Sequence, residues 1–258
     1  MFEWHAFLTA GIVLITMATV TWIISLLKKD ASIVDSFWSI MIVAAFFVYL
    51  LTASSHGVRW FVVGTLLLIW GVRLSLYITV RNWGDDEDKR YQDIRNKYQP
   101  HYWIKSLFIV FIFQALLAWL VSLPLLGIVT GSTTISFIDY AGLALVLFGI
   151  GFESIADYQL YRFRQDGKNR GQVMDKGLWK YTRHPNYFGE FCVWWGFFLF
   201  AISAGAWWSV VSPLIMSFLL LKFSGVVLLE KDISKRRPRY AEYIKSTNAF
   251  FPGPSRCS

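Results

Sequence analysis

The chain contains a series of apolar runs that are long enough to cross a lipid bilayer. An α-helix rises about 1.5 Å per residue, so about 20 apolar residues span the hydrocarbon core. Runs of this kind fall near residues 6–27, 36–51, 60–80, 106–129, 137–157, 188–203 and 207–229. With 55% hydrophobic and 18% aromatic residues, they predict an all-α integral membrane protein with seven transmembrane helices.

Basic residues are concentrated in alternate connections between these runs. The connections after the first, third and fifth runs and the tail carry most of the Lys and Arg, whereas "TASSHGVR", "TGSTTIS" and "AGAWWS" contain only Arg59 between them. The positive-inside rule then places the N-terminus outside and the C-terminus in the cytoplasm. Opposite sides require an odd number of spans, which supports seven. The net charge of +8 is assigned to cytoplasmic loops facing anionic lipids, not to nucleic-acid binding.

Several kinds of site are disfavoured by the residues present. Cys192 and Cys257 do not form a disulfide framework, and the four histidines have no metal-ligand spacing. No Gly-x-Gly-x-x-Gly after a strand, Walker loop or serine nucleophile elbow occurs. No cleavable signal peptide is visible, so we expect the first span to be retained.

Ionisable and polar side chains nevertheless fall within the predicted spans. A charge inside a bilayer costs several kcal/mol unless it is paired or lines a wet cavity, so such residues mark candidate sites. They are Asp35, Arg73 with Tyr77, Glu153 with Asp157, Glu190 and Lys222. Those of the third, fifth and sixth spans lie near cytoplasmic ends and could converge on one cavity. The alternative, for Arg73 with Tyr77 and for Lys222 above all, is buried ion pairing that fixes helix register.

The densest polar cluster is "YTRHPNYFGEF", residues 181–191. Pro185 favours a helix start, which puts Asn186 and Glu190 in the first turn and a half of the sixth span. The free N–H groups there, with Arg183, predict an anion site, and Glu190 and Asp157 supply acceptors for ribose hydroxyls or an amide. A nucleotide fits this combination. The alternative is a capped helix that contacts lipid headgroups.

A second polar stretch, "GDDEDKRYQDIRNKYQ", follows the third span. Its composition predicts a cytoplasmic helix that is interfacial or soluble. The ordinary interpretation of such a charge run is a solvated face, with function as the less favoured alternative.

The segments "GLWKYTRHPNYFGE" and "LLEKDISKRRPRYAEYIKSTNAFFP" strongly resemble the C-terminal domain of the steroid 5α-reductase family, including bacterial members. More loosely, the chain resembles the wider superfamily that includes sterol C14-reductases and isoprenylcysteine carboxyl methyltransferases. The resemblance is specific over about residues 152–252. It implies a single seven-helix domain, residues 1–258, that encloses NADPH on the cytoplasmic side. Residues 1–105 would contribute to the substrate pocket, and residues 106–258 would carry most of the cofactor site.

The resemblance also implies site residues. Those that match cofactor-binding positions are Arg73, Tyr77, Glu153, Asp157, Arg164, Asn186 and Glu190. From the same basic and aromatic segments, the predicted cofactor site also includes Arg170, Tyr181, Arg183, His184, Tyr187, Arg236, Arg237 and Tyr240. The predicted substrate pocket includes Trp38, Trp70 and Trp194. No metal is expected.

Asp35 is the candidate catalytic residue, at the position of a carboxylate that bonds the substrate carbonyl in the animal enzymes, where it is a Glu. Hydride can add to a C=C bond only when a conjugated carbonyl takes up the negative charge, so a protonated acid at that oxygen would stabilise the enolate. Three residues depart from the family's pattern: Trp70 stands where a carbonyl-binding Tyr is expected, Gln172 stands where an Arg often binds the cofactor, and Asp35 is a shorter acid than Glu. Glu153 stands where the steroid reductases usually have an Asn.

The sequence therefore predicts an NADPH-dependent reductase of a hydrophobic enone, such as a 3-oxo-Δ4-steroid, that enters from the bilayer. We expect a monomer among membrane lipids, in a bacterial inner membrane. The alternative enzyme is an S-adenosylmethionine-dependent membrane methyltransferase of the same superfamily. A lipid-binding or transport protein is the third interpretation, and the absence of an inverted repeat disfavours it.

Overall fold

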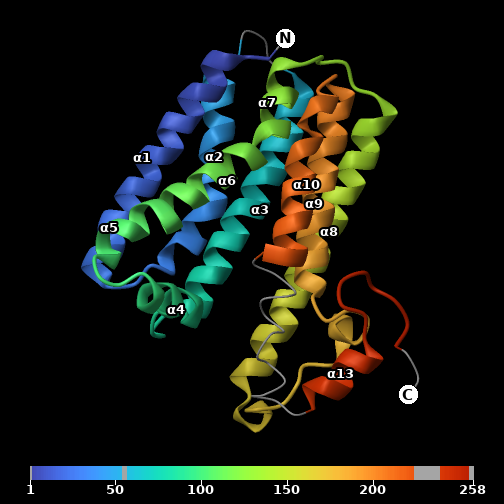
Figure 1. The fold of residues 1–258 in the computed structure, drawn as a ribbon. Coiled ribbons are helices and arrows are strands. Elements are labelled where there is room, and N and C mark those ends of the chain that lie inside the picture. The colour runs from blue at the N-terminus through green and yellow to red at the C-terminus, as the bar shows by residue number, and fades with distance from the viewer. Residues whose placement is uncertain (1, 54–56, 224–238, 256–258) are drawn as a thin grey trace. The chain divides into compact units, whose positions relative to one another are not determined.

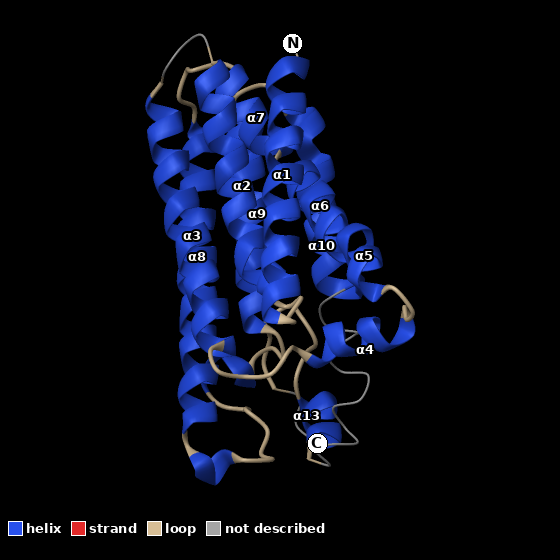
Figure 2. Ribbon diagram, turned by 90° about the vertical axis from the view of Figure 1, so that its left-hand side faces the viewer, coloured by secondary structure: helices blue, strands red, loops and turns tan. Residues whose placement is uncertain are grey.

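The computed structural model describes residues 2–53, 57–223 and 239–255, and the regular structure in this part of the chain is all helical (Figures 1 and 2). The helices are α1 (Trp4–Lys28), α2 (Ile33–Thr52), α3 (Val58–Asn82), α4 (Lys89–Lys97), α5 (Tyr102–Ser106), α6 (Phe113–Val121), α7 (Leu123–Thr130), α8 (Phe137–Gln165), α9 (Pro185–Ser203), α10 (Val211–Phe218) and α13 (Tyr240–Ser246). Short π and 3-10 turns are η1 (Leu107–Ile112), η2 (Gly167–Asn169), η3 (Gly177–Lys180), η4 (Trp207–Val210) and η5 (Leu219–Phe223).

Five helical segments are long and apolar enough to cross a membrane: Trp4–Lys28, Ile33–Thr52, Val58–Asn82, Tyr102–Thr130 and Phe137–Gln165. They correspond to the first five predicted runs, so the prediction of an all-α, multi-pass membrane protein is confirmed. The sixth run forms α9. The described part of the seventh run includes the apolar helical segment Trp207–Lys222, and residues 224–229 of that run lie outside the described residues. The count of seven spans and the orientation of the termini stay predictions.

The described chain divides into two compact units. The first comprises residues 1–135 and 200–212, and the second comprises residues 136–199 and 213–258. The boundaries fall after α7 and inside α9 and α10. The prediction of one domain, with a change of role near residue 105, stays a prediction.

In the first unit, α2 packs against α1, α3, α6 and α7 (Figure 1). Close approach of α2 to α3 depends on a small residue, because a Cβ on Gly71 would lie 2.7 Å from Val43. The Ser39 hydroxyl donates to the Gly71 carbonyl over 2.8 Å at the same place. Apolar residues at helical spacing along α2 are buried against these neighbouring helices.

Arg59 is the one Lys or Arg in the three connections predicted to lie outside. It falls at the start of α3 and is fully buried in the first unit. Its guanidinium donates to the backbone carbonyls of Ser132 and Thr134 and to the Ser203 hydroxyl. A buried guanidinium is tolerated only when its donors are satisfied. Arg59 therefore joins the ends of α3, α7 and α9.

In the second unit, α8 and α9 run antiparallel and touch through glycines. A Cβ on Gly149 would lie 2.7 Å from the Gly189 carbonyl oxygen, and one on Gly196 would lie 2.5 Å from Val146. Larger side chains at these positions would separate the two helices. The crossing places the C-terminal half of α8 beside the first turns of α9.

The predicted helix start at Pro185 is confirmed, since α9 begins there and its first helical hydrogen bond runs from the Phe188 amide to the His184 carbonyl. By contrast, α8 continues to Gln165, past the predicted end near residue 157. The segment "YQLYRFRQ" contains good helix formers, and the helix does not have to end where its apolar run ends. This extension positions Arg164.

Candidate functional site

Three acidic residues are buried in the second unit near the crossing of α8 and α9. Glu153 and Asp157 are each 3% exposed and lie one turn apart on α8, and Glu190 is 6% exposed on α9. Glu153 packs against Gly189, since a Cβ on that glycine would lie 2.7 Å from the Glu153 Cβ. The structure thus brings the predicted carboxylates of both helices to the same crossing. Buried carboxylates in membrane helices mark ligand or ion sites.

Glu190 is oriented by a neighbour on its own helix. The Trp194 indole N–H donates to Glu190 Oε1 over 3.0 Å, and Trp194 is fully buried. These residues lie at i and i+4, one turn apart. Trp194, predicted to line a substrate pocket, therefore supports a carboxylate predicted to bind the cofactor.

The segment before α9 packs along the C-terminal half of α8. The Trp179 indole donates to the Ala156 carbonyl over 3.1 Å, and the Leu178 amide donates to Gln159 Oε1 over 3.0 Å. Gly177 has φ +60°, and a Cβ there would meet the Gln159 side chain at 2.5 Å. This turn needs glycine, and it fixes the path of the chain into the segment "YTRHP".

Arg183 and Thr182 contact the C-terminal segment of the chain. The Arg183 guanidinium donates to the carbonyls of Ile244 (3.2 Å) and Thr247 (2.5 Å), at the end of α13. The Thr182 hydroxyl donates to the Phe250 carbonyl over 2.8 Å. A cation at a helix C-terminus is a favourable arrangement. Arg183, predicted to bind phosphate, is thus 8% exposed and holds the tail in place.

The remaining predicted residues of this region lie around the same segment. The His184 and Tyr187 rings are stacked, with centroids 5.6 Å apart. Asn186 is half-buried in the first turn of α9, and Tyr181 is exposed. Tyr240, on α13, is buried edge-on against Tyr243. Arg236 and Arg237 lie outside the described residues.

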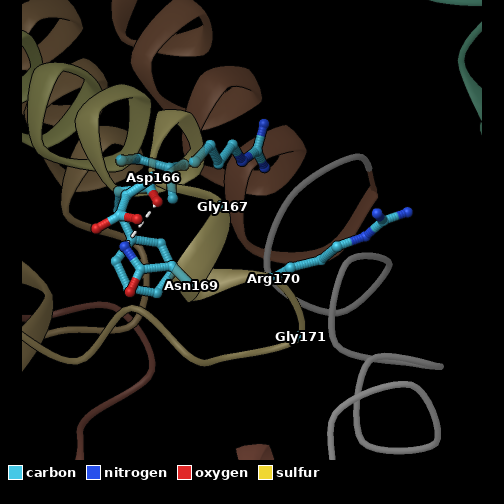
Figure 3. A pocket seen from close by; sticks show the side chains of 8 residues that line it. Asp166, Gly167, Asn169, Arg170 and Gly171 are labelled. Atoms are coloured by element: carbon cyan, nitrogen blue, oxygen red, sulfur yellow. Dashed lines mark hydrogen bonds between the residues drawn. The ribbon is translucent and has the colours of Figure 1, made fainter.

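A cavity of about 380 Å³ lies at the C-terminal end of α8 (Figure 3). Arg164 and Arg170, both predicted to bind cofactor, line it, as do Leu160, Phe163, Asp166 and Asn169. The cavity thus combines two guanidinium groups and one carboxylate with an apolar wall. Figure 3 shows Arg170 extending away from the turn on the side opposite Asn169.

In the first unit, Asp35 is the centre of a polar cluster with α4. Asp35 Oδ2 accepts from Arg90 over 2.8 Å and Oδ1 accepts from the Tyr91 hydroxyl over 2.6 Å. Gln114 donates to the Tyr91 oxygen over 3.4 Å. Asp35 is therefore an acceptor in this arrangement, whereas its predicted role requires it to donate to a carbonyl.

The charges of this cluster reinforce one another. Burial, and then the negative charge of Asp35, raise the pKa of Tyr91 well above its ordinary value, so its hydroxyl stays protonated. Burial acts to lower the pKa of Arg90, but the carboxylates of Asp35 and Asp88 outweigh it and raise that pKa. Both side chains are thus fixed as donors.

A second ion pair fixes α4 to the connection between α1 and α2. Glu87 accepts from the Ala31 amide and, in bidentate fashion, from Arg95, over 2.8 to 2.9 Å. Arg95 also donates to the Lys29 carbonyl over 3.2 Å. The predicted helix is confirmed in α4, while its cytoplasmic position stays a prediction. The charges of this segment are used in these contacts and not only in a solvated face.

The other predicted residues of the first unit lie on α2 and α3. Arg73 and Tyr77 are half-buried one turn apart on α3, where the Arg81 guanidinium lies 5.8 Å from the Tyr77 ring centre. Trp70 is fully buried and Trp38 is half-buried. These residues belong to the first unit, whereas the acidic residues of α8 and α9 belong to the second.

Within residues 2–53, 57–223 and 239–255, no three His, Cys, Asp or Glu side chains are grouped as a metal site would need. The side-chain chemistry of the second unit tests whether a cofactor would fit there. Buried carboxylates can accept hydrogen bonds from ribose hydroxyls and a carboxamide, and exposed arginines can bind phosphates. Together these groups fit a dinucleotide.

Comparison with known proteins extends these observations. Residues 21–247 match the model of a family described as a protein of unknown function, DUF1295. The chain belongs to this family. The DUF1295 family is part of the steroid 5α-reductase-like superfamily, so the wider resemblance is confirmed, while membership of the steroid 5α-reductases themselves stays a prediction.

A relative of this DUF1295 protein is an uncharacterized protein from Schizosaccharomyces pombe. It is 26% identical over 273 residues, which cover 92% of this chain and 76% of the relative. No solved structure matches the chain. The relative is fungal, so the predicted bacterial inner membrane stays a prediction.

Arg90, Tyr91 and Gln114 are not among the site residues that the sequence of this DUF1295 protein predicts. Tyr91 differs from its neighbours in sequence, because it is a large aromatic residue inside a strongly polar helix. A large aromatic side chain is favoured in a buried position, and Tyr91 is 5% exposed. Its hydroxyl would then need a buried partner, for which Asp35 at the predicted membrane edge is a candidate.

Proposed function

We propose that this protein uses NADPH to reduce the C=C bond of a membrane-soluble enone, with a 3-oxo-Δ4-steroid as the candidate substrate class. The observation that carries the proposal is the set of buried carboxylates on α8 and α9, together with an arginine-lined cavity at the C-terminal end of α8. The carboxylates can accept hydrogen bonds from the hydroxyl and amide groups of a dinucleotide, and the arginines can bind its phosphates. The superfamily of the DUF1295 family is consistent with an enzyme.

The residues proposed to hold the cofactor divide by chemistry. Glu153, Asp157 and Glu190 would accept hydrogen bonds from ribose and carboxamide groups, and Asn186 would bind at the first turn of α9. Arg164 and Arg170 would bind phosphate. The cofactor would supply a hydride, and the protein's part is to orient it and exclude water.

The carbonyl-polarising group is proposed to be Asp35 together with Tyr91. Asp35 accepts from Arg90 and Tyr91, so it would have to exchange one of these donors and take up a proton before it could donate. The Tyr91 hydroxyl is already a donor and is the second candidate for the bond to the carbonyl oxygen. Either group would stabilise the negative charge that hydride transfer places on that oxygen.

The topology proposed with this function is seven spans, N-terminus outside and C-terminus cytoplasmic. The distribution of Lys and Arg in the sequence supports it. The helix α9 and the apolar helical segment Trp207–Lys222 would contribute the sixth and seventh spans.

The first test is mass spectrometry of small molecules released by denaturing the detergent-purified protein. We expect NADP(H) from the wild type, and its loss from Asn186→Ala/Glu190→Ala. Glu242→Ala, which removes an exposed carboxylate of α13, is the control and should retain the cofactor. Release of S-adenosylmethionine or its demethylated product instead would replace the reductase with a methyltransferase, and no nucleotide from any sample would oppose both enzymes.

The second test is turnover of a 3-oxo-Δ4-steroid, followed by NADPH absorbance and product mass. Asp35→Asn and Tyr91→Phe are each expected to reduce kcat by about 100-fold or more while NADPH still binds, because removal of one oxyanion donor has effects of that size. Full turnover by Asp35→Asn with bound NADPH would remove Asp35 from the mechanism, and the same holds for Tyr91.

A further inference from the structure

The indole nitrogen of Trp38 is a buried donor without an acceptor. Within residues 2–53, 57–223 and 239–255, no atom accepts a hydrogen bond from Trp38 Nε1, although this nitrogen is shielded from solvent. An indole N–H can donate but cannot accept, so no other arrangement satisfies it. A buried donor that stays unpaired opposes folding, and each such group in a fold therefore calls for an explanation.

Other tryptophans of the first unit have acceptors. The Trp22 indole donates to the Trp103 carbonyl and the Trp119 indole donates to the Phe7 carbonyl, each over 2.9 Å. Trp22 and Trp119 are half-buried, as Trp38 is. Backbone carbonyls thus serve indole groups elsewhere in this unit, and Trp38 differs from these tryptophans in its bonding and not in its burial.

Trp38 lies beside the candidate catalytic carboxylate. It follows Asp35 by three residues on α2, and residues three apart share one face of a helix. This spacing places Trp38 about 4.5 Å farther along the helix axis than Asp35. Long side chains of a helix lean toward its N-terminus, so we expect the Trp38 ring to lean toward the turn that carries Asp35.

The donors already known in this cluster are engaged with one another. Asp35 accepts from Tyr91 over 2.6 Å and from Arg90 over 2.8 Å. Asp35 or Tyr91 would have to exchange a partner before it could bind a ligand, whereas the Trp38 N–H has no partner to give up. It is also a neutral donor, so it can stabilise negative charge on an oxygen without a change in its own protonation.

The resemblance leaves a place for such a donor. Trp70, on α3, stands where a carbonyl-binding Tyr is expected. The Ser39 hydroxyl donates to the carbonyl of Gly71, the residue after Trp70. Position 38 on α2 is therefore close to the level of position 70 on α3, and a donor at position 38 can take the part of the expected Tyr.

We propose that the Trp38 indole N–H donates to the carbonyl oxygen of the enone substrate. This inference rests on the proposed function. It explains the unpaired donor, because the substrate supplies the acceptor that the fold does not. Trp38 would then bind the carbonyl in the ground state and stabilise the negative charge that hydride transfer places on it.

The test removes the N–H and keeps the ring. In 3-benzothienylalanine, incorporated at position 38 of the full chain, sulfur takes the place of the indole N–H. We expect testosterone, a 3-oxo-Δ4-steroid, to bind about 5- to 10-fold more weakly in nanodiscs with NADP+. With NADPH, kcat/KM should fall by about 100-fold, because the bond strengthens as charge develops on the oxygen. The 3-deoxy analogue of testosterone lacks the carbonyl and should bind the wild type and the variant equally.

Thermal unfolding without steroid separates this role from a structural one. Replacement at position 38 should not lower the unfolding temperature, because no bond within the protein is lost. The same replacement at Trp119 is the matched control. It removes the bond to the Phe7 carbonyl, so it should lower the unfolding temperature and change steroid affinity by less than about twofold.

The outcomes separate this inference from the proposed function. If the wild type reduces testosterone and the replacement at position 38 changes neither affinity nor kcat/KM, Trp38 is not the carbonyl donor and the reductase proposal stands. A lower unfolding temperature at position 38, as at position 119, would overturn the inference, because the N–H would then have a partner in the protein. An equal loss of affinity for the 3-deoxy analogue would overturn it too, since the carbonyl would not be the acceptor. If the wild type neither binds nor reduces testosterone, both proposals fail together.

Discussion

The acidic residues of the two units are satisfied in different ways. Asp35 in the first unit has a side chain that is 16% exposed, and it pairs with the guanidinium of Arg90 and the hydroxyl of Tyr91. In the second unit Glu153 and Asp157 are each only 3% exposed, and Glu190 accepts from the indole of Trp194. The first cluster, Asp35 with Arg90 and Tyr91, joins α2 to α4 by charge. The second cluster, Glu153, Asp157 and Glu190, lies near the close crossing of α8 and α9, where the donors of a ligand could reach the carboxylates.

This difference indicates what each cluster contributes. An ion pair at the membrane edge, such as Asp35 with Arg90, fixes a polar helix to the bundle and loses little when water reaches it. Three carboxylates buried close to one helix crossing are costly to place there, and ionisable residues inside membrane helices commonly mark functional sites. The first cluster has an evident structural use in holding α4, while the second is the stronger indication of a ligand.

The largest effect is expected where α8 and α9 touch. In Gly189→Ala the new Cβ would lie 2.7 Å from the Glu153 backbone nitrogen and Cβ and from the Gly149 carbonyl. Backbone atoms cannot move aside, so we expect a loss of about 2–3 kcal/mol in stability and loss of NADPH binding. Thermal unfolding in detergent and dinucleotide titration measure both.

Gly151→Ala is the control for this variant. Gly151 lies on the same helix, and a Cβ there would have no atom within 4 Å. Its replacement should stabilise the helix by about 0.5–1 kcal/mol. Equal stability of the two variants would contradict the close crossing that brings the second cluster together.

The next effect separates the hydrogen bond to Glu190 from packing. Trp194→Phe keeps an aromatic ring but removes the buried indole donor, so we expect a cost of about 1–3 kcal/mol from the Glu190 acceptor that loses it. Trp195→Phe removes a longer, 3.3 Å contact to Ser217 at a half-buried position. It should cost less in the same thermal unfolding assay. A larger loss from Trp195→Phe would mean that the Glu190 contact is not important.

The local structure around these clusters can be predicted from the sequence, but the residues that their charged side chains contact cannot. Pro185 fixes φ and suits the first turn of a helix, so the start of α9 could be predicted from a few residues. Arg183 was predicted to bind phosphate, and its guanidinium donates to carbonyls 61 and 64 residues away. Asp35 is likewise unusual as a carboxylate within a predicted span, but its partner Arg90 lies 55 residues later in the sequence. Composition and spacing identify a charged side chain at a membrane edge, but not which distant segment packs onto it.

A smaller effect is expected from the first cluster. Asp35→Ala removes the acceptor of Arg90 and Tyr91, and we expect a loss of about 1–2 kcal/mol, because the pair is partly exposed. Hydrogen exchange should show faster opening of α4 than of α2. Asp93→Ala, at an exposed position of α4, should change neither quantity. If Asp35→Ala leaves α4 protected but abolishes enone reduction, the cluster is catalytic and the structural explanation is insufficient.

The smallest effect concerns the stability of α4 at low pH. Asp88 caps this helix, since its carboxylate accepts from the Arg90 amide over 2.9 Å and from the Arg90 side chain over 3.0 Å. Burial acts to raise the pKa of Asp88, but the hydrogen bonds and charge of Arg90 outweigh it and hold that pKa below its ordinary value. A carboxyl whose pKa is lower in the folded state stabilises the fold above the unfolded pKa, about 4, and this contribution is lost as pH falls through the folded pKa.

We therefore expect exchange of the α4 amides to accelerate below about pH 4, relative to the intrinsic rate at each pH. Asp88→Asn retains a good N-cap but loses the titrating charge, so it should weaken α4 by less than about 1 kcal/mol at neutral pH. Its acid dependence should also be reduced. An unchanged acid response in Asp88→Asn would show that Asp88 does not cause it. The other contacts that hold α4 are those of Asp35 with Arg90 and of Glu87 with Arg95. The first cluster would then depend on its long-range ion pairs more than on the cap.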